Sequence, residues 1–193
     1  MSVRTAYQKV ESRRKLGIDI GRHLVLAVGQ LQPRKALTDF YRCAAAFPDA
    51  LFIWVGGYPF GPLTAQYWTT RRLVRNSPEN VVHVGQVERD QVMQYYLTAD
   101  VYLHPSRQEN ASVAVLEAAT AGIPLVLRSI ECHRELYGEA AILFGSILAM
   151  KLQIHRLLSC SPYRVEMAAR ARILAEKFSC GSMAERLVDI YRN

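Results

Sequence analysis

The sequence has no long hydrophobic run and few cysteines. No apolar stretch reaches the roughly 18 residues that a helix needs to cross a bilayer, and the opening residues MSVRTAYQKVESRRKLGID lack the apolar core of a secretory signal peptide. The cysteines show neither CxxC nor metal-ligand spacing; they are Cys43, Cys132, Cys160 and Cys180. We therefore expect reduced thiols in a cytoplasmic protein.

Several catalytic motifs are also missing. The sequence has no GxxxxGK(S/T) loop of the kind that grips phosphates, and no GxGxxG pattern follows the first predicted strand, which argues against a nicotinamide-dependent dehydrogenase. The histidines show no metal-ligand spacing, and no Ser-His-Asp arrangement is visible. We predict no metal site and no cofactor.

Acidic residues are scarce relative to basic ones. Seventeen Asp and Glu stand against 24 Lys and Arg, which gives a net charge of +7. This surplus favours an anionic partner, which could be nucleic acid, an acidic membrane surface or a phosphorylated ligand. Because no nucleic-acid-binding motif is present, we predict no nucleic-acid partner. One basic cluster lies at Arg71, Arg72 and Arg75, and taken alone it is most simply a solvated helix face.

The remaining pattern is that of an α/β protein. Short apolar runs predict strands at residues 24–28, 51–55, 81–84, 101–104 and 125–127. Between them, helical patterns occur at 37–46, 63–74, 90–98 and 112–121. Continuous rather than alternating hydrophobicity is typical of strands buried on both faces of a parallel sheet. We therefore predict a Rossmann-like three-layer domain with a parallel sheet.

The two ends of the chain differ from this middle part. From residue 147 onward only helices are predicted, including 164–178 and 183–191. We divide the chain into a lead-in at 1–16, the Rossmann-like domain at 17–146 and C-terminal helices at 147–193 that pack on the same domain.

Candidate binding residues follow the predicted strands, because open parallel sheets bind ligands beyond the carboxyl ends of their strands. After the first strand, Gly29 permits close backbone approach, and Arg34 and Lys35 place two cations where a diphosphate could bind. Gly56 follows the second strand, before the aromatic loop YPFGP. This loop could contact an acceptor or a membrane, or it could simply pack over the sheet, which is the slightly favoured alternative.

The strongest local signal is the stretch HPSRQENAS, which ends the fourth strand and runs into a helix. Free backbone N–H groups at a helix start favour a phosphate. Glu109 lies just before this helix and Glu117 about two turns inside it, roughly 12 Å apart along the axis. Each carboxylate could accept hydrogen bonds from vicinal hydroxyls, with phosphates between them. The simpler alternative for Glu117 is a salt bridge to a nearby arginine.

Taken together, VGQLQPRKAL, IWVGG, VVHVGQV and ADVYLHPSRQENASVAVLEAATAGIPLVLRS resemble the C-terminal domain of family 4 glycosyltransferases, one half of the two-domain GT-B fold. The resemblance covers roughly residues 17–144. It implies a nucleotide-sugar donor and transfer with retention of the anomeric configuration, without a divalent metal.

The resemblance also implies roles for individual residues. Glu109 would bind hydroxyls of the donor sugar and Glu117 those of the ribose, while Arg34 and Lys35 would be the phosphate-binding cations. Three further groups would contact the donor: Gly29, Gln30 and Gly56 at the first two strand ends, Gly85 and Gln86 at the nucleobase, and the backbone of Asn110, Ala111 and Ser112 at the diphosphate. Two positions depart from the family pattern. Many family members have arginine where this chain has Gln30, and glycine where it has Ala36.

Within the family, the stretches GQLQPRKAL, FIWVGGYPFGPLTAQY and QENASVAVLEAATAGIPLVLRS are similar to bacterial enzymes that transfer glucose from UDP-glucose to diacylglycerol. This narrower resemblance implies a diacylglycerol acceptor and a peripheral position on anionic lipid at the inner face of the cell membrane. The alternatives are a cell-wall or capsular saccharide acceptor, or a nucleotide-sugar-binding module without catalysis.

The length of 193 residues leaves no room for the second GT-B domain. We expect an N-terminal domain as a partner of this chain, which would then be a fragment, a truncated gene product or a subunit. The isolated chain should bind a nucleotide sugar but transfer it slowly or not at all.

Overall fold

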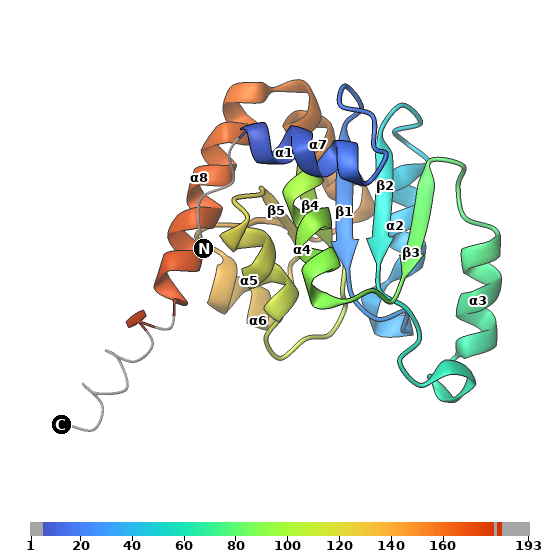
Figure 1. Ribbon diagram of the computed structural model, residues 1–193. Helices are drawn as coiled ribbons and strands as arrows, with labels where there is room; N and C mark the ends of the chain where they lie inside the picture. The colour runs from blue at the N-terminus through green and yellow to red at the C-terminus, as the bar shows by residue number, and fades with distance from the viewer. Residues whose placement is uncertain (1–5, 180, 183–193) are drawn as a thin grey trace, which may run out of the picture.

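A single parallel sheet organises the computed structural model, which describes residues 6–179 and 181–182 (Figure 1). The six strands lie in the order β3-β2-β1-β4-β5-β6, and each pairs in parallel with its neighbour. They are β1 (Leu24–Val28), β2 (Leu51–Val55), β3 (Val81–Gly85), β4 (Val101–His104), β5 (Leu125–Arg128) and β6 (Ile142–Phe144). The predicted Rossmann-like α/β fold is confirmed. The sixth strand was not predicted, because three residues carry too little pattern.

Helices connect the strands and cover both faces of the sheet (Figure 1). They are α1 (Ala6–Lys15), α2 (Leu37–Ala44), α3 (Tyr67–Arg75), α4 (Arg89–Thr98), α5 (Val113–Thr120), α6 (Glu131–Tyr137), α7 (Ile147–Ser159) and α8 (Ser161–Lys177), with 3-10 turns η1 (Pro33–Lys35) and η2 (Gly61–Leu63). The helix predicted at 63–74 begins only at Tyr67, because Gln66 has φ 55°, a left-handed conformation that cannot continue a right-handed helix. Helix α6 was missed, and the helix predicted at 183–191 lies outside the described residues.

The hydrophobic core has two halves, one on each face of the sheet. Within β1, Val25 and Ala27 belong to one half and Leu24 and Leu26 to the other, and all four are buried. The first half is completed by α2 and α7, the second by α4, α5 and the end of α8. Burial on both faces explains why the strands read as unbroken apolar runs. Among the described residues, no helix is long and apolar enough to cross a membrane.

The N-terminal helix is attached to the domain by a buried arginine. The Arg13 side chain donates to the carbonyls of Thr98 and Arg22 and forms an ion pair with Asp100, with an Nη2–Oδ2 distance of 2.9 Å. The same Asp100 oxygen accepts a hydrogen bond from the backbone N–H of Leu24, the first residue of β1. Helix α1 therefore ties together the end of α4 and the starts of β1 and β4.

Replacing this arginine should destabilise the domain strongly. In Arg13→Met, Asp100 loses a buried partner and several carbonyls lose their donor, so we expect the free energy of unfolding in urea to fall by about 3–5 kcal/mol. The matched control is Arg14→Met, which removes the neighbouring, exposed arginine. It should stay within about 0.5 kcal/mol of the wild type. Equal stability of the two variants would contradict the anchoring role of Arg13.

Candidate functional site

The order of the strands creates a crevice between β1 and β4. The chain leaves β1 toward β2 on one side and reaches β4 on the other, so the loops after β1 and β4 diverge at the carboxyl edge of the sheet. Gly29 and Gly56 begin the loops after β1 and β2 and lie in direct backbone contact. A Cβ on Gly56, which has φ +123°, would lie 2.2 Å from the Gly29 carbonyl oxygen. Glycine is therefore required at position 56.

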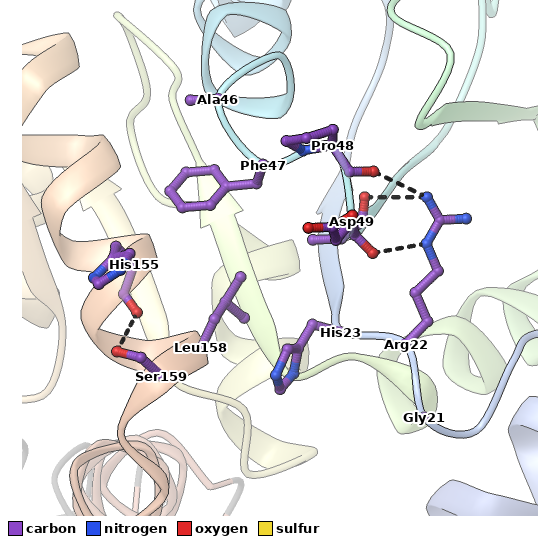
Figure 2. A pocket seen from close by; sticks show the side chains of 11 residues that line it. Gly21, Arg22, His23, Ala46, Phe47, Pro48, Asp49, His155, Leu158 and Ser159 are labelled. Carbon is purple, nitrogen blue, oxygen red and sulfur yellow. Dashed lines mark hydrogen bonds between the residues drawn. The ribbon is translucent and has the colours of Figure 1, made fainter.

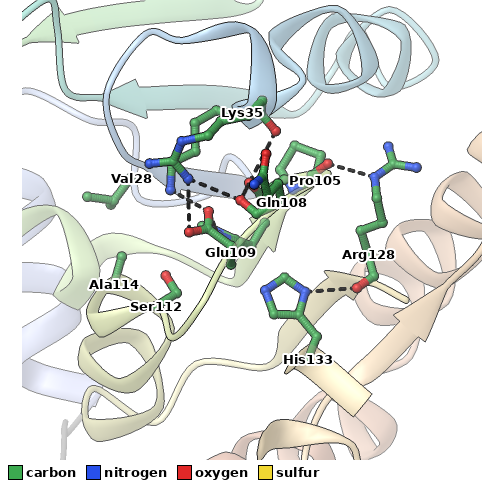
Figure 3. Close-up of polar contacts among 12 residues, drawn as sticks. Val28, Lys35, Pro105, Gln108, Glu109, Ser112, Ala114, Arg128 and His133 are labelled. Carbon is green, nitrogen blue, oxygen red and sulfur yellow. Dashed lines mark hydrogen bonds and ion pairs between the residues drawn. The ribbon is translucent and has the colours of Figure 1, made fainter. Parts of the chain in front are cut away.

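The two loops at the crevice meet at one carboxylate. Glu109 Oε1 accepts from Lys35 Nζ at 2.5 Å, and Glu109 Oε2 accepts from Arg34 Nη1 at 3.0 Å. Figure 3 shows Lys35 and Glu109 pointing toward one another from the two loops. The Glu109 side chain is 7% exposed, whereas Arg34 is 39% exposed. Two cations and one carboxylate leave one positive charge in excess at the mouth of the crevice, which suits an anionic ligand.

Backbone contacts hold the loop after β4 against the loop after β1. The Arg107 N–H donates to the Arg34 carbonyl at 2.8 Å, and the Ser106 hydroxyl donates to the same oxygen. On the other side, Arg128 Nε donates to the Pro105 carbonyl at 2.8 Å, a bond drawn in Figure 3. The position of Glu109 is thus fixed by its surroundings before any ligand arrives.

A buried histidine, His104, contacts the Glu109 carboxylate. His104 Nε2 lies 3.1 Å from Glu109 Oε1, and His104 Nδ1 lies 3.1 Å from the hydroxyl of Tyr102. Burial lowers the pKa of His104 to about 4, so the ring is neutral at pH 7. Because a carboxylate only accepts, Nε2 carries the proton and Nδ1 accepts from Tyr102. Sequence reasoning missed this chain, although Tyr102 and His104 are two residues apart and so share one face of β4.

The carboxyl group of Glu109 is ionised over the whole physiological range. Burial alone raises its pKa, but hydrogen bonds from His104 and Lys35 outweigh burial and hold the pKa well below its usual range. Glu109 is therefore an acceptor of hydrogen bonds at neutral pH and has no proton to donate. This state favours binding of hydroxyl groups over general acid catalysis.

Glu117 lies within α5 and has a hydrogen-bond partner of its own. The buried Tyr96 donates its hydroxyl to Glu117 Oε2 at 3.1 Å. The arginine predicted as the simpler alternative is also present, since Arg89 Nη2 lies 3.8 Å from Glu117 Oε1. Arg89 is 84% exposed, so this pair contributes little. Tyr96 was missed because nothing in the sequence links α4 to α5.

The start of α5 offers backbone N–H groups near the cations. The first turn of a helix has N–H groups without intrahelical partners, and Ser112 is the N-cap of α5. The Ser112 N–H, however, donates to the hydroxyl of Tyr137 at 3.0 Å. In the chain without ligand, this N–H therefore already has an acceptor. Tyr137 comes from α6, a helix that sequence reasoning did not foresee.

Most of the predicted donor-binding residues line two pockets, whereas Lys35, Gly85, Ser112 and Glu117 line neither. One pocket of about 340 Å³ is lined by Arg34, Gln108, Glu109, Asn110 and Ala111. A second, of about 230 Å³, is lined by residues that include Gly29, Gln30, Gly56 and Gln86. Gly85 contacts this second pocket through Gly56, whose N–H donates to the Gly85 carbonyl at 2.8 Å. The structure thus brings the predicted residues to one edge of the sheet.

The two departures from the family pattern have different structural settings. Ala36 has φ 55°, in the left-handed region that favours glycine, which explains why glycine is common at this position. Gln30 is exposed, and its side-chain oxygen accepts from Gln32 at 2.8 Å. Arg34 lies in the same loop, where its Nε donates to the side-chain oxygen of Gln32 at 3.1 Å.

A larger pocket of about 440 Å³ lies at the opposite edge of the sheet (Figure 2). Its lining includes Phe47, Leu158 and Arg22. The Arg22 guanidinium donates to the carbonyls of Pro48 and Asp49 and so stabilises the loop between α2 and β2. The pocket is also lined by His23, Asp49 and His155, which come from the loops before β1 and β2 and from α7. Among the described residues, no group of three or more His, Cys, Asp or Glu could hold a metal ion.

Fold and site together define a Rossmann-like domain of the GT-B type. The chain matches the family model described as "Glycosyl transferases group 1" over residues 8–174. The chain therefore belongs to the group 1 glycosyltransferases.

Similar proteins include two that are named for glycolipid synthesis. The chain is 34% identical over 125 residues to the alpha-galactosylglucosyldiacylglycerol synthase of Streptococcus pneumoniae, covering 65% of this chain and 33% of the relative. It is 28% identical over 134 residues to the processive diacylglycerol alpha-glucosyltransferase of Acholeplasma laidlawii, covering 69% and 40%. The chain thus spans well under half the length of these relatives. Among solved structures, Anabaena HepE in complex with UDP and glucose has a TM-score of 0.81 at 20% identity, with 98% of this chain and 53% of that one covered.

The neutral state of His104 predicts a pH-dependent stability. Its folded-state pKa of about 4 lies below the usual histidine value of 6.5, so between these values the unfolded chain binds a proton that the folded chain does not. The free energy of unfolding should therefore fall as the pH drops through this window, by up to about 1.4 kcal/mol per pH unit from this residue. Urea unfolding across the window measures the slope, and His104→Gln should flatten it. A slope that is the same in both proteins would contradict a buried neutral His104.

Proposed function

We propose that this chain is the donor-binding half of a retaining glycosyltransferase that transfers glucose from UDP-glucose to diacylglycerol. The single observation that carries the proposal is the convergence of Arg34, Lys35 and Glu109 at the crevice between β1 and β4. The names of the two diacylglycerol glycosyltransferase relatives support the acceptor, and the UDP bound to HepE supports the donor.

The donor would lie along the edge of the sheet, from the second pocket to the first. The nucleobase would meet the backbone at Gly85 and Gln86, and the ribose hydroxyls would bind Glu117. The diphosphate would lie between the start of α5 and the two cations, and the sugar would reach Glu109. Because the ring and ribose hydroxyls are donors and both carboxylates are acceptors, each end of the donor meets a complementary group.

The chemical step requires that negative charge build up on the departing UDP. Arg34 and Lys35 would stabilise this charge, together with the N-terminal end of α5, with no divalent metal. In the chain without ligand, Glu109 neutralises part of this positive charge. On binding, the diphosphate would compete with Glu109 for the cations and leave its carboxylate available to the sugar hydroxyls. Transfer itself would also need an N-terminal domain that carries the acceptor.

Calorimetric titration with UDP and UDP-glucose tests this assignment through the two glutamates. Glu117→Ala should weaken both ligands alike, by about tenfold or more, because a charged hydrogen-bond acceptor is lost. Glu109→Ala should abolish any preference for UDP-glucose over UDP without weakening UDP, since the two cations remain. Glu135→Ala, an exposed carboxylate on α6, is the control and should bind like the wild type. If both variants bind UDP-glucose like the wild type, or the wild type binds neither ligand, the proposal is wrong.

Tyr96 should act on the donor only through Glu117. Tyr96→Phe removes the hydroxyl that donates to the Glu117 carboxylate and helps to position it. The variant should therefore weaken the binding of UDP and of UDP-glucose equally, by about threefold to tenfold. The ratio of the two affinities should not change. Tyr95→Phe removes a hydroxyl from the adjacent residue and serves as the control. A changed ratio in Tyr96→Phe would show that Tyr96 contacts the sugar instead.

A further inference from the structure

Large apolar side chains are exposed where β2 leads into α3. Phe60 is 68% exposed, Leu63 89% and Trp68 68%. A single exposed apolar residue is ordinary, but three of this size within nine positions are unusual. We call these residues, with three neighbouring arginines, the α3 surface: Phe60, Leu63, Trp68, Arg71, Arg72 and Arg75.

The α3 surface is also strongly basic. The segment 51–78 contains no aspartate or glutamate, so its three arginines have no acidic neighbour in sequence. In the part of the chain that the structure describes, none of these arginines forms an ion pair with a carboxylate. The Arg71 guanidinium lies 5.8 Å from the Trp68 ring centroid, which places a cation beside the exposed indole. Because residues three, four and seven positions apart share one face of a helix, Arg71, Arg72 and Arg75 lie on the same face of α3 as Trp68.

The position of this surface is related to that of the site. In Figure 1, α3 stands beyond the edge strand β3, at the opposite end of the molecule from α8. The η2 turn, which carries Leu63, follows the loop of Gly56 and Gly57 that lines the second pocket. The apolar part of the α3 surface therefore belongs to the same edge of the sheet as the pockets.

We propose that the α3 surface docks the protein on a bilayer that contains anionic lipids. Phe60, Leu63 and Trp68 would enter the headgroup region, where aromatic and aliphatic side chains bury apolar area, and the arginines would bind lipid phosphates. Docking through this edge would bring the crevice to the lipid surface. The inference goes beyond the proposed function, because binding to a bilayer requires neither the donor nor a reaction.

A lipid surface fits these residues better than a nucleic acid does. Cations bind a phosphate backbone and an aromatic ring can stack on a base, but the aliphatic side chain of Leu63, which is 89% exposed, has no partner of either kind in a nucleic acid. Trp68 beside Arg71 is the combination found at membrane interfaces, where the ring lies at headgroup level and the cation lies among phosphates.

The two tryptophans make the contact measurable. Trp54 is buried in the sheet at 2% exposure, whereas Trp68 is exposed, so a change of solvent affects only Trp68. Titration with phosphatidylcholine vesicles containing phosphatidylglycerol should shift the emission to shorter wavelength. Vesicles of phosphatidylcholine alone should give little shift, and added salt should weaken the response. Trp68→Phe should bind the vesicles but lose the shift.

Sedimentation with the same vesicles separates the two contributions. Arg72→Gln with Arg75→Gln should lower the partition coefficient by about fivefold for each charge removed. Phe60→Ser with Leu63→Ser should lower it by about tenfold or more. The matched control is Val165→Ser with Ile173→Ser, which removes two exposed apolar side chains from α8 and should bind like the wild type.

Several outcomes would overturn the docking surface. The docking surface is wrong if the protein does not bind the anionic vesicles, or if all variants bind them equally. It is also wrong if the Trp68 shift appears without lipid and rises with protein concentration, because that result would indicate self-association through this face. Tighter binding to single-stranded or duplex DNA than to vesicles would indicate a nucleic-acid surface instead. The variants lie outside the pockets, so their titration with UDP-glucose should match the wild type. Failure of docking and failure of donor binding are thus distinguishable.

Discussion

The ion pairs of Glu109 link the two loops on which the site depends. Arg34 and Lys35 come from the loop after β1, and Glu109 from the loop after β4, some 75 residues later along the chain. Their meeting is possible only because β1 and β4 are neighbours in the sheet. A buried carboxylate needs such partners, since the loss of hydration would otherwise raise its pKa. The same contacts thus order the loops and keep Glu109 ionised.

The two glutamates differ in how they are held. Glu109 is bound by cations and by the neutral His104, whereas Glu117 is bound mainly by the Tyr96 hydroxyl. A ligand with negative charge can displace the first arrangement by competing for the cations. The second arrangement involves a neutral donor, and a phosphate does not compete for it. In the proposed complex with the donor, Glu109 would therefore be coupled to the charge of the ligand, and Glu117 would be a fixed acceptor.

Much of the fold could be predicted from local pattern. Five strands follow from apolar runs, and their continuity follows from burial on both faces. Short elements could not be predicted, because three residues in β6 and seven in α6 are too few to show a period. The error at α3 has a different cause. Gln66 adopts a left-handed backbone conformation with φ 55°, which local pattern does not reveal, and so the helix begins only at Tyr67.

By itself, the sequence determined the residue types at each strand end: glycines where backbones approach, cations after β1 and carboxylates around the start of α5. Local order along the chain is enough for this, because each loop is contiguous. Only the tertiary structure decided which groups touch. It gave Tyr96 to Glu117, Tyr137 to the Ser112 N–H and His104 to Glu109. Tyr96 and Tyr137 are distant in sequence from the groups they contact, and His104 lies within an apolar strand. A buried polar group requires a partner, but this requirement does not specify which element supplies it.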